Sequence, residues 1–105
     1  MNYSKYRIPF PLIDIYFLIW KPNAISKIHN HSRNGCYMLL LKGDIKEEIY
    51  SKNLSLIDHN LYSTLDLSYI NDDKGYHRIL NSNKYAYSLH FYHPKNHITK
   101  YYMII

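Results

Sequence analysis

The chain has 105 residues, which is enough for one domain with one modest hydrophobic core. Hydrophobic residues make up 47% and charged residues 20%, a balance that argues against an intrinsically disordered chain. The net charge is +5, but the lysines and arginines are scattered without a basic run, so we expect no binding to nucleic acid.

A single cysteine and the absence of a long apolar stretch set the expectations for location. Cys36 has no second cysteine with which to form a disulfide, which fits a reducing compartment. The apolar segment 13–20 is too short to span a bilayer, contains Asp14 and is not followed by a cleavage site for a signal peptide. We therefore expect a cytoplasmic, monomeric protein that does not associate with membranes.

Short strands separated by polar turns are predicted along most of the chain. Residues 1–10 form a short N-terminal segment that carries Arg7. The strands expected after this segment are residues 13–20, 37–43, 45–50, 66–70, 85–92 and 97–105. Gly43 and Asp44 separate two of them directly, so we expect this pair to form the tip of a β-hairpin. Residues 54–67 are expected to be a loop or an irregular strand.

This spacing of strands and turns predicts an all-β protein with about seven or eight short strands. Such a pattern is typical of a sandwich or barrel, and the jelly-roll class, which includes the cupins, fits best. We expect residues 1–105 to form a single cupin domain, with the barrel itself spanning residues 11–105.

Two histidines separated by one residue form the first candidate metal site. On a strand, His29 and His31 point to the same side, so their imidazoles converge if that side faces the barrel interior. Imidazole is a good ligand for iron, zinc, copper and nickel. Because the chain contains 7 histidines, such a pair also arises by chance, and the spacing alone leaves a pair without a metal open.

A second set of polar residues alternates along segment 85–92. Ser88, His90 and Tyr92 share one face of this strand, where they can form a hydrogen-bonded row in which the histidine orients the tyrosine. The alternative is an outward polar face with Leu89 and Phe91 turned inward, and alternation does not decide between the two.

The remaining histidines and the cysteine carry no clear signal by themselves. His77 follows a polar turn and resembles a surface histidine. His59, His93 and His97 have no partner at a useful spacing, so we expect them on the surface. Cys36 precedes an apolar strand, as a small buried hydrophobic residue would.

Three stretches of the sequence carry more information than these residues taken singly. They read SKIHNHSRNGCYMLLLKGDIKEEIY, YINDDKGYHRILN and YSLHFYHP. In order and spacing they resemble successive sequence blocks of the cysteine dioxygenase family of thiol dioxygenases, and the resemblance extends from about Arg7 to Pro94. Members of this family are cupins that bind one non-haem iron(II) through three histidines. The resemblance implies that Fe(2+) is the cofactor and that its ligands are His29, His31 and His77.

The same resemblance implies roles for the residues around the metal. Cys36 corresponds to the position at which many cupins have a carboxylate ligand, and in the family it can form a thioether bond with the residue that matches Tyr92. Ser88 and His90 correspond to residues that orient this tyrosine. Trp20 matches the tryptophan that precedes the first ligand.

The implied reaction is the oxidation of L-cysteine by O2 to cysteine sulfinic acid, a step of cysteine catabolism. Arg7 is the candidate for binding the substrate carboxylate, because its guanidinium suits bidentate contacts, although a surface arginine is the alternative. Two other functions stay open. One is the same chemistry on another small thiol such as 3-mercaptopropionate, and the other is a non-catalytic cupin that binds metal or senses thiols.

The sequence also departs from the family pattern at several places. We expect no helical region before the barrel, where members of the family usually have one. The loop at residues 51–64 is shorter than its counterpart, and Gly35 stands where a bulkier residue is more common. These departures remove none of the proposed ligands.

Overall fold

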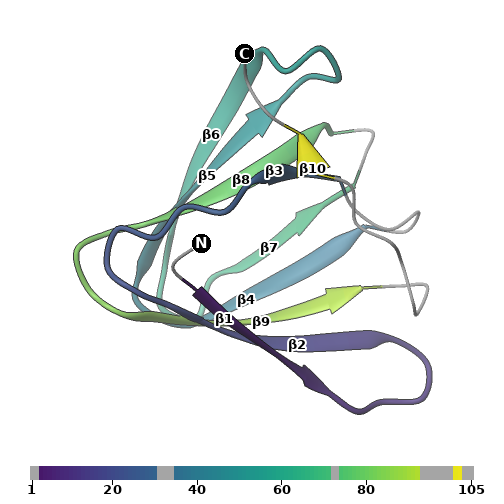
Figure 1. Cartoon of the computed structure of the whole chain (residues 1–105), viewed down its shortest axis with the longest axis vertical. Coiled ribbons are helices and arrows are strands. Elements are labelled where there is room, and N and C mark those ends of the chain that lie inside the picture. Colours follow the sequence, from purple (N-terminus) through teal and green to yellow (C-terminus); the bar gives the residue numbers. More distant parts are fainter. Residues whose placement is uncertain (1–2, 31–34, 72–73, 93–100, 103–105) are drawn as a thin grey trace.

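Two antiparallel β-sheets of five strands each form the structure, a computed structural model that describes residues 3–30, 35–71, 74–92 and 101–102. The first sheet contains, in spatial order, β1 (Tyr3–Ile8), β2 (Asp14–Trp20), β9 (Ala86–Tyr92), β4 (Cys36–Lys42) and β7 (Leu67–Ile70). The second contains β10 (Tyr101–Tyr102), β3 (Ile28–His29), β8 (Tyr76–Asn81), β5 (Asp44–Tyr50) and β6 (Leu56–Ser63). The sheets face each other as two layers (Figure 1).

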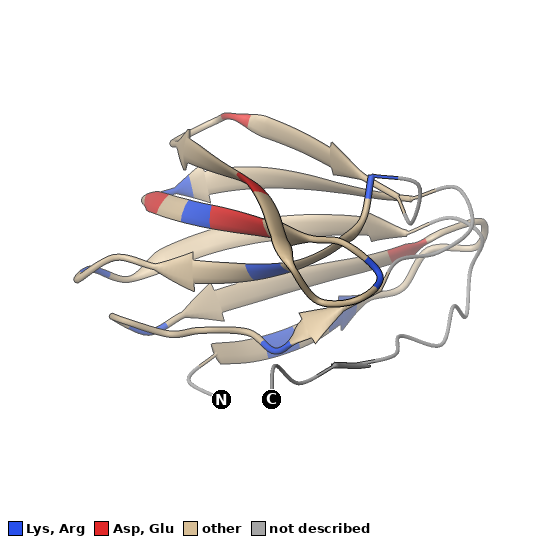
Figure 2. Cartoon of the chain, turned by 90° about the horizontal axis from the view of Figure 1, so that it is seen from above, with Lys and Arg blue, Asp and Glu red and all other residues tan. Residues whose placement is uncertain are grey.

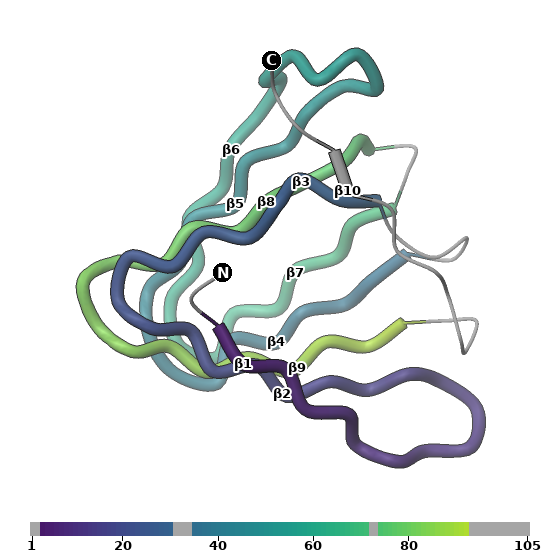
Figure 3. Tube along the Cα trace, in the orientation of Figure 1, coloured from purple at the N-terminus to yellow at the C-terminus, as the bar shows by residue number. Residues whose placement is uncertain are grey.

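The Cα trace shows the strands of the two sheets as separate layers (Figure 3). Alternate side chains of the strands point into the space between these layers, and their packing makes the core. The larger buried cluster contains Leu18, Trp20, Ala24, Met38, Leu40, Ile45, Ile79 and Ala86. A smaller cluster contains Cys36, Ile49, Ile70 and Tyr92. Both clusters take residues from each sheet, so burying them fixes the distance between the two layers.

The all-β prediction is confirmed, and most expected strands form within a residue or two of their predicted ends. The segment 54–67 resolves into an eight-residue strand, β6, which pairs with β5 at the edge of the second sheet. A register shift lies between Ile49 and Tyr50 of β5, which explains the irregular pattern in the sequence of its partner. Of the strand predicted at residues 97–105, the structure describes Tyr101–Tyr102, which form β10.

The hairpin predicted at Gly43 and Asp44 is wrong. β4 pairs with β9 and β7, whereas β5 pairs with β6 and β8, so the two strands belong to different sheets. Gly43 is therefore the corner at which the chain crosses between the layers. Its φ is +119°, and a Cβ at this position would lie 2.7 Å from the Cβ of Ala86. The glycine is thus required by a sheet-to-sheet corner rather than by a tight turn.

The N-terminal segment is itself part of the barrel. β1 pairs with β2 over its full length, with Tyr3 opposite Trp20 and Arg7 opposite Tyr16. The boundary expected near residue 10 is therefore a turn between paired strands. This pairing turns alternate residues of β1, including Lys5, toward the second sheet.

Charged residues are spread over several strands and turns of the described chain and do not gather in one stripe (Figure 2). The expectation that the chain does not bind nucleic acid stays a prediction. Among the described residues, no helix has the length and apolar character needed to cross a membrane.

Candidate metal and substrate site

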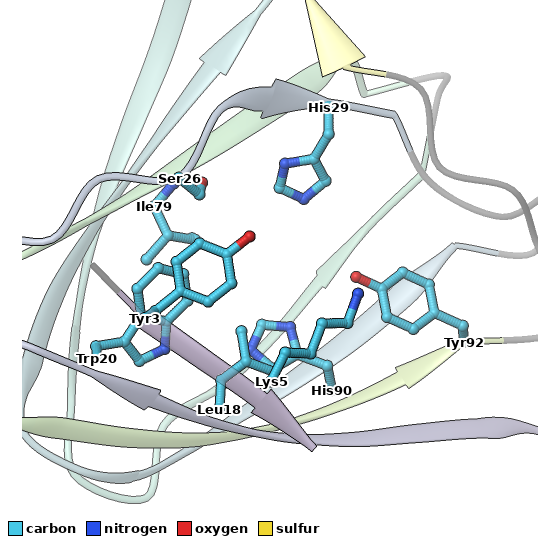
Figure 4. Close-up of a pocket in the computed structure, with 9 residues that line it drawn as sticks. All are labelled: Tyr3, Lys5, Leu18, Trp20, Ser26, His29, Ile79, His90 and Tyr92. Carbon is cyan, nitrogen blue, oxygen red and sulfur yellow. Dashed lines mark hydrogen bonds between the residues drawn. The ribbon is translucent and has the colours of Figure 1, made fainter. Parts of the chain in front are cut away.

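Side chains from both sheets meet in a small cavity between the layers. The second sheet contributes His29, and the first contributes Lys5, Trp20, His90 and Tyr92 (Figure 4). The cavity measures about 20 Å³, which is room for roughly one water molecule. Titratable groups are thus collected at one point between the sheets, where His90 is buried, His29 is half-buried and Lys5 is exposed.

His29 and His77 bring two imidazole rings together from neighbouring strands of the second sheet. Their Cα atoms are register partners in the pair of β3 and β8. Their Nε2 atoms lie 2.9 Å apart, and their ring centroids are separated by 4.5 Å. His77 is 3% exposed, so this pair is shielded from bulk water on the side of β8.

The Nδ1 atom of each ring fixes where its proton sits. Nδ1 of His29 donates to the carbonyl oxygen of Lys27 at 2.8 Å, because a carbonyl can only accept. Nδ1 of His77 donates to Oε2 of Glu47 at 2.6 Å. Burial lowers the pKa of His29 to about 4, and it lowers the pKa of His77 well below the usual value. Both rings are therefore neutral at pH 7 and present a lone pair at Nε2.

This arrangement fits a metal cation. Two lone pairs that face each other across 2.9 Å repel unless a proton or a cation lies beside them. Two nitrogens bound to one ion at about 2.1 Å and at right angles are about 3.0 Å apart. The observed separation of the Nε2 atoms of His29 and His77 is close to this value, so the pair suits two adjacent positions around one ion.

The third predicted ligand, His31, lies outside the described residues, so the complete set of three histidines stays a prediction. Within the ranges that the structure describes, no group of three or more His, Cys, Asp or Glu side chains is arranged to hold a metal. Two of the three predicted ligands, His29 and His77, are brought together.

Cys36 and Tyr92 lie opposite each other on β4 and β9, as register partners of the first sheet. Their exposed fractions are 2% and 7%, and a side-chain hydrogen bond joins them. Burial raises the pKa of the Cys36 thiol to about 12, which keeps it protonated at pH 7. The two side chains predicted to form a thioether are therefore in contact, while the bond itself stays a prediction.

The open question about segment 85–92 is resolved in favour of an inward polar face. Ser88 is fully buried and His90 is 5% exposed, whereas Leu89 lies half-buried on the outer face. The indole N–H of Trp20 donates to Ser88 Oγ at 2.9 Å, and Ser88 Oγ is hydrogen-bonded to His90 Nε2 at 2.8 Å. Burial lowers the pKa of His90 to about 3, so its ring is neutral at pH 7.

Among the described residues, the cation that lines the cavity is Lys5, whereas Arg7 does not line it. Arg7 instead pairs with the buried carboxylate of Asp14 at 3.2 Å. The Lys5 amino group lies over the ring of Tyr16, 4.2 Å from its centroid. Figure 4 shows it pointing into the same space as the hydroxyl of Tyr92. Burial lowers the pKa of Lys5 below its usual value.

Comparison with known proteins identifies the family to which this arrangement belongs. The family described as cysteine dioxygenase type I matches residues 12–103. This chain belongs to that family. The cysteine dioxygenase type 1 proteins of Homo sapiens and Rattus norvegicus are 28% and 30% identical to it, each over 89% of the chain. The chain spans about half the length of these curated relatives, since the matches cover 54% of each.

Solved structures support the same fold for this member of the cysteine dioxygenase family. Peruvianin-I, a cysteine peptidase from Thevetia peruviana latex, superposes with a TM-score of 0.80 at 16% identity, covering 99% of this chain and 69% of that one. An oxalate oxidase superposes with a TM-score of 0.76 at 14% identity, covering 95% of this chain and 55% of that one. At such identities the likeness shows the fold alone, which is that of a cupin.

Two residues of this family member's site escaped sequence analysis. Glu47 was missed because it lies more than ten residues after His31 and thirty before His77, so no local spacing links it to a histidine. The available signal was its place between Ile45 and Ile49, since a carboxylate among inward apolar residues requires a partner. Lys5 was missed because β1 had not been predicted as a strand.

Proposed function

We propose that this chain is an iron(II)-dependent thiol dioxygenase that oxidises L-cysteine with O2 to cysteine sulfinic acid. One observation carries the proposal: two neutral imidazoles aim their Nε2 atoms at one point between the sheets, in a chain of the cysteine dioxygenase family. The specific substrate and the activity are part of the proposal, because the chain spans about half of its relatives.

His29 and His77, together with the predicted ligand His31, would hold the iron. When bound, iron(II) supplies open coordination positions for thiol and O2 and the redox chemistry that joins them. Three neutral imidazoles leave the charge of the ion uncompensated, which favours binding of the substrate as a thiolate. The carbonyl of Lys27 and the carboxylate of Glu47 keep the Nδ1 protons in place, so the Nε2 lone pairs stay available for the ion.

The opposite sheet would bind the rest of the substrate. In place of Arg7, we propose that Lys5 binds the carboxylate of L-cysteine, because its amino group is the cation in the described cavity. An ammonium is a point charge, so it attracts a carboxylate without the bidentate geometry of a guanidinium. The hydroxyl of Tyr92 borders the same space and can donate a hydrogen bond to the substrate or to the oxygen that it gains.

The reaction needs no additional reductant. Both atoms of one O2 molecule are transferred to sulfur, which is oxidised from thiol to sulfinic acid while the O2 is fully reduced. Leu18, Trp20 and Ile79 form apolar walls that limit water near the reacting atoms. Because a cavity of about 20 Å³ does not hold L-cysteine, the Lys5 side chain must leave the ring of Tyr16 as the substrate enters.

The deciding experiment measures O2 uptake and product with excess L-cysteine and ferrous iron, using ¹⁸O2 and mass spectrometry. We expect one O2 consumed for each cysteine sulfinic acid formed, with both oxygens labelled. His77→Ala should reduce turnover to the background of ferrous iron alone. Glu48→Gln, which changes a carboxylate on the outer face of β5, should retain turnover. Uptake that does not exceed the iron-only background would refute the proposal.

The same assay separates the alternative functions. Turnover of 3-mercaptopropionate without turnover of L-cysteine would keep the chemistry and overturn the substrate. Iron binding without turnover of either thiol would indicate a cupin that binds metal or senses thiols.

A further inference from the structure

Glu47 is a buried carboxylate that does not line the cavity between the sheets. It is 1% exposed and belongs to β5, where its inward neighbours along the strand are Ile45 and Ile49. Moving an ionised carboxylate into such surroundings costs several kcal/mol unless its oxygens are paired. An apolar side chain at this position would fit the core at lower cost, so the carboxylate needs an explanation in terms of what it contacts.

Both oxygens of Glu47 are used, and they are used on opposite sides. Oε2 accepts from Nδ1 of His77 on β8 at 2.6 Å. Oε1 accepts from the hydroxyl of Tyr62 at 2.8 Å and from Nδ2 of Asn60 at 3.2 Å, both on β6. The carboxylate therefore joins the proposed metal ligand to the edge strand of the sheet.

The sheet register explains how these groups meet. Glu47 is directly opposite Asn60 on one side and Ile79 on the other. His77 and Tyr62 lie one diagonal step from it on the same inward face, within reach of a glutamate side chain. Burial raises the pKa of Tyr62 to about 12, so its hydroxyl remains a donor.

The neighbouring carboxylate shows a different arrangement. Glu48 points to the other face of β5, where it accepts from Nε of Arg78 at 2.6 Å and from the hydroxyl of Tyr50 at 2.8 Å. Its partners on that face are Arg78, Lys46 and Tyr50, so it belongs to a local ion-pair network. Glu48 therefore provides a matched control, one residue away on the same strand.

We propose that Glu47, held by Tyr62 and Asn60, is the positioning residue that fixes the ring of His77 for metal binding. Edge strand β6 thereby contributes to the affinity of the centre, although none of its residues reaches the metal ligands directly. This inference rests on the metal centre of the proposed function but not on the reaction that it catalyses.

The test uses Co(II) as the probe and measures its affinity and visible absorption spectrum in the full chain. Losing the partner of a ligand histidine typically lowers metal affinity by about 10- to 100-fold, which is the effect expected for Glu47→Leu. Glu47→Gln keeps an acceptor for Nδ1 and should recover most of this loss. Tyr62→Phe removes only the outer bond and should weaken Co(II) binding about threefold or more. Glu48→Gln should stay within about twofold of the wild type.

A second readout reports on the ring itself. Long-range ¹H–¹⁵N spectra of the metal-free protein should show the Nδ1–H tautomer for His77 in the wild type and a mixture of tautomers in Glu47→Leu. Unchanged affinity and an unchanged tautomer in Glu47→Leu would overturn the inference, as would an equal loss in Glu48→Gln. If Glu47→Leu does not fold, Tyr62→Phe decides, and wild-type Co(II) affinity in that variant overturns it. None of these measurements depends on cysteine turnover. They therefore test the role of Glu47 even if the chain does not oxidise cysteine.

Discussion

The metal-free protein should lose stability between pH 7 and pH 5 because His90 takes up a proton only when the chain unfolds. The pKa of this ring is about 3 in the fold, against 6.5 when exposed. A lowered folded pKa means that the stabilising contribution is complete above pH 6.5 and is lost as the pH falls toward 3. Proton linkage with these two values gives a loss of about 2 kcal/mol between pH 7 and pH 5.

Urea unfolding of EDTA-treated protein at pH 7, 6 and 5 measures this loss. His90→Gln keeps a hydrogen-bonding group beside the hydroxyl of Ser88 but cannot titrate, so it should lose about 2 kcal/mol less than the wild type over the same range. His59→Gln changes an exposed ring and should follow the wild type. His29 and His77 add to the loss in all three proteins and Glu47 opposes it, so these contributions cancel in the difference. Equal losses in His90→Gln and in the wild type would refute the reasoning.

Three further predictions concern the cavity and the corner. Lys5→Met should raise the KM for L-cysteine about tenfold with little change in kcat. Arg7→Met should lower the free energy of unfolding by about 1 kcal/mol and leave KM unchanged. A larger KM effect from Arg7→Met than from Lys5→Met would show that Arg7, not Lys5, binds the substrate carboxylate. If Cys36 and Tyr92 form a thioether, intact mass after turnover should fall by about two hydrogens and the thiol should resist alkylation in denaturant, whereas full alkylation would show that no bond forms. Gly43→Ala should destabilise the chain by at least about 1 kcal/mol in urea unfolding, since both φ and space are unsuitable for a Cβ, and a wild-type midpoint would contradict the assigned corner.

Strand positions were predictable because alternation and turn residues are local signals. The β2 and β9 segments combine β-branched and aromatic residues with clear polar ends, and both form close to their expected limits. The pairing of these strands is not local. Gly43 followed by Asp44 suits a hairpin, but the neighbours of β4 are β9 and β7, which come later in the chain. Only the tertiary fold decides between a hairpin and a corner.

The direction of the polar face of β9 was unpredictable for a related reason. Both faces of this strand carry large side chains, with His90 and Tyr92 on one and Leu89 and Phe91 on the other. When either face of a strand could pack into the core, the side chains across the interior decide which face turns inward. Here the indole of Trp20 donates to Ser88, which is also hydrogen-bonded to His90, so these polar side chains can turn inward.

In the proposed site, metal binding and substrate binding depend on residues of different sheets, so the two roles can be tested separately. His29, His77 and Glu47 belong to the second sheet, so metal affinity depends on pairing within that layer. Lys5 and Tyr92 belong to the first sheet and meet the metal ligands only across the core. A substitution that shifts one layer against the other should therefore change KM for the thiol more than affinity for the metal. Substitutions along β6 should do the reverse, because their effect reaches the centre through Glu47.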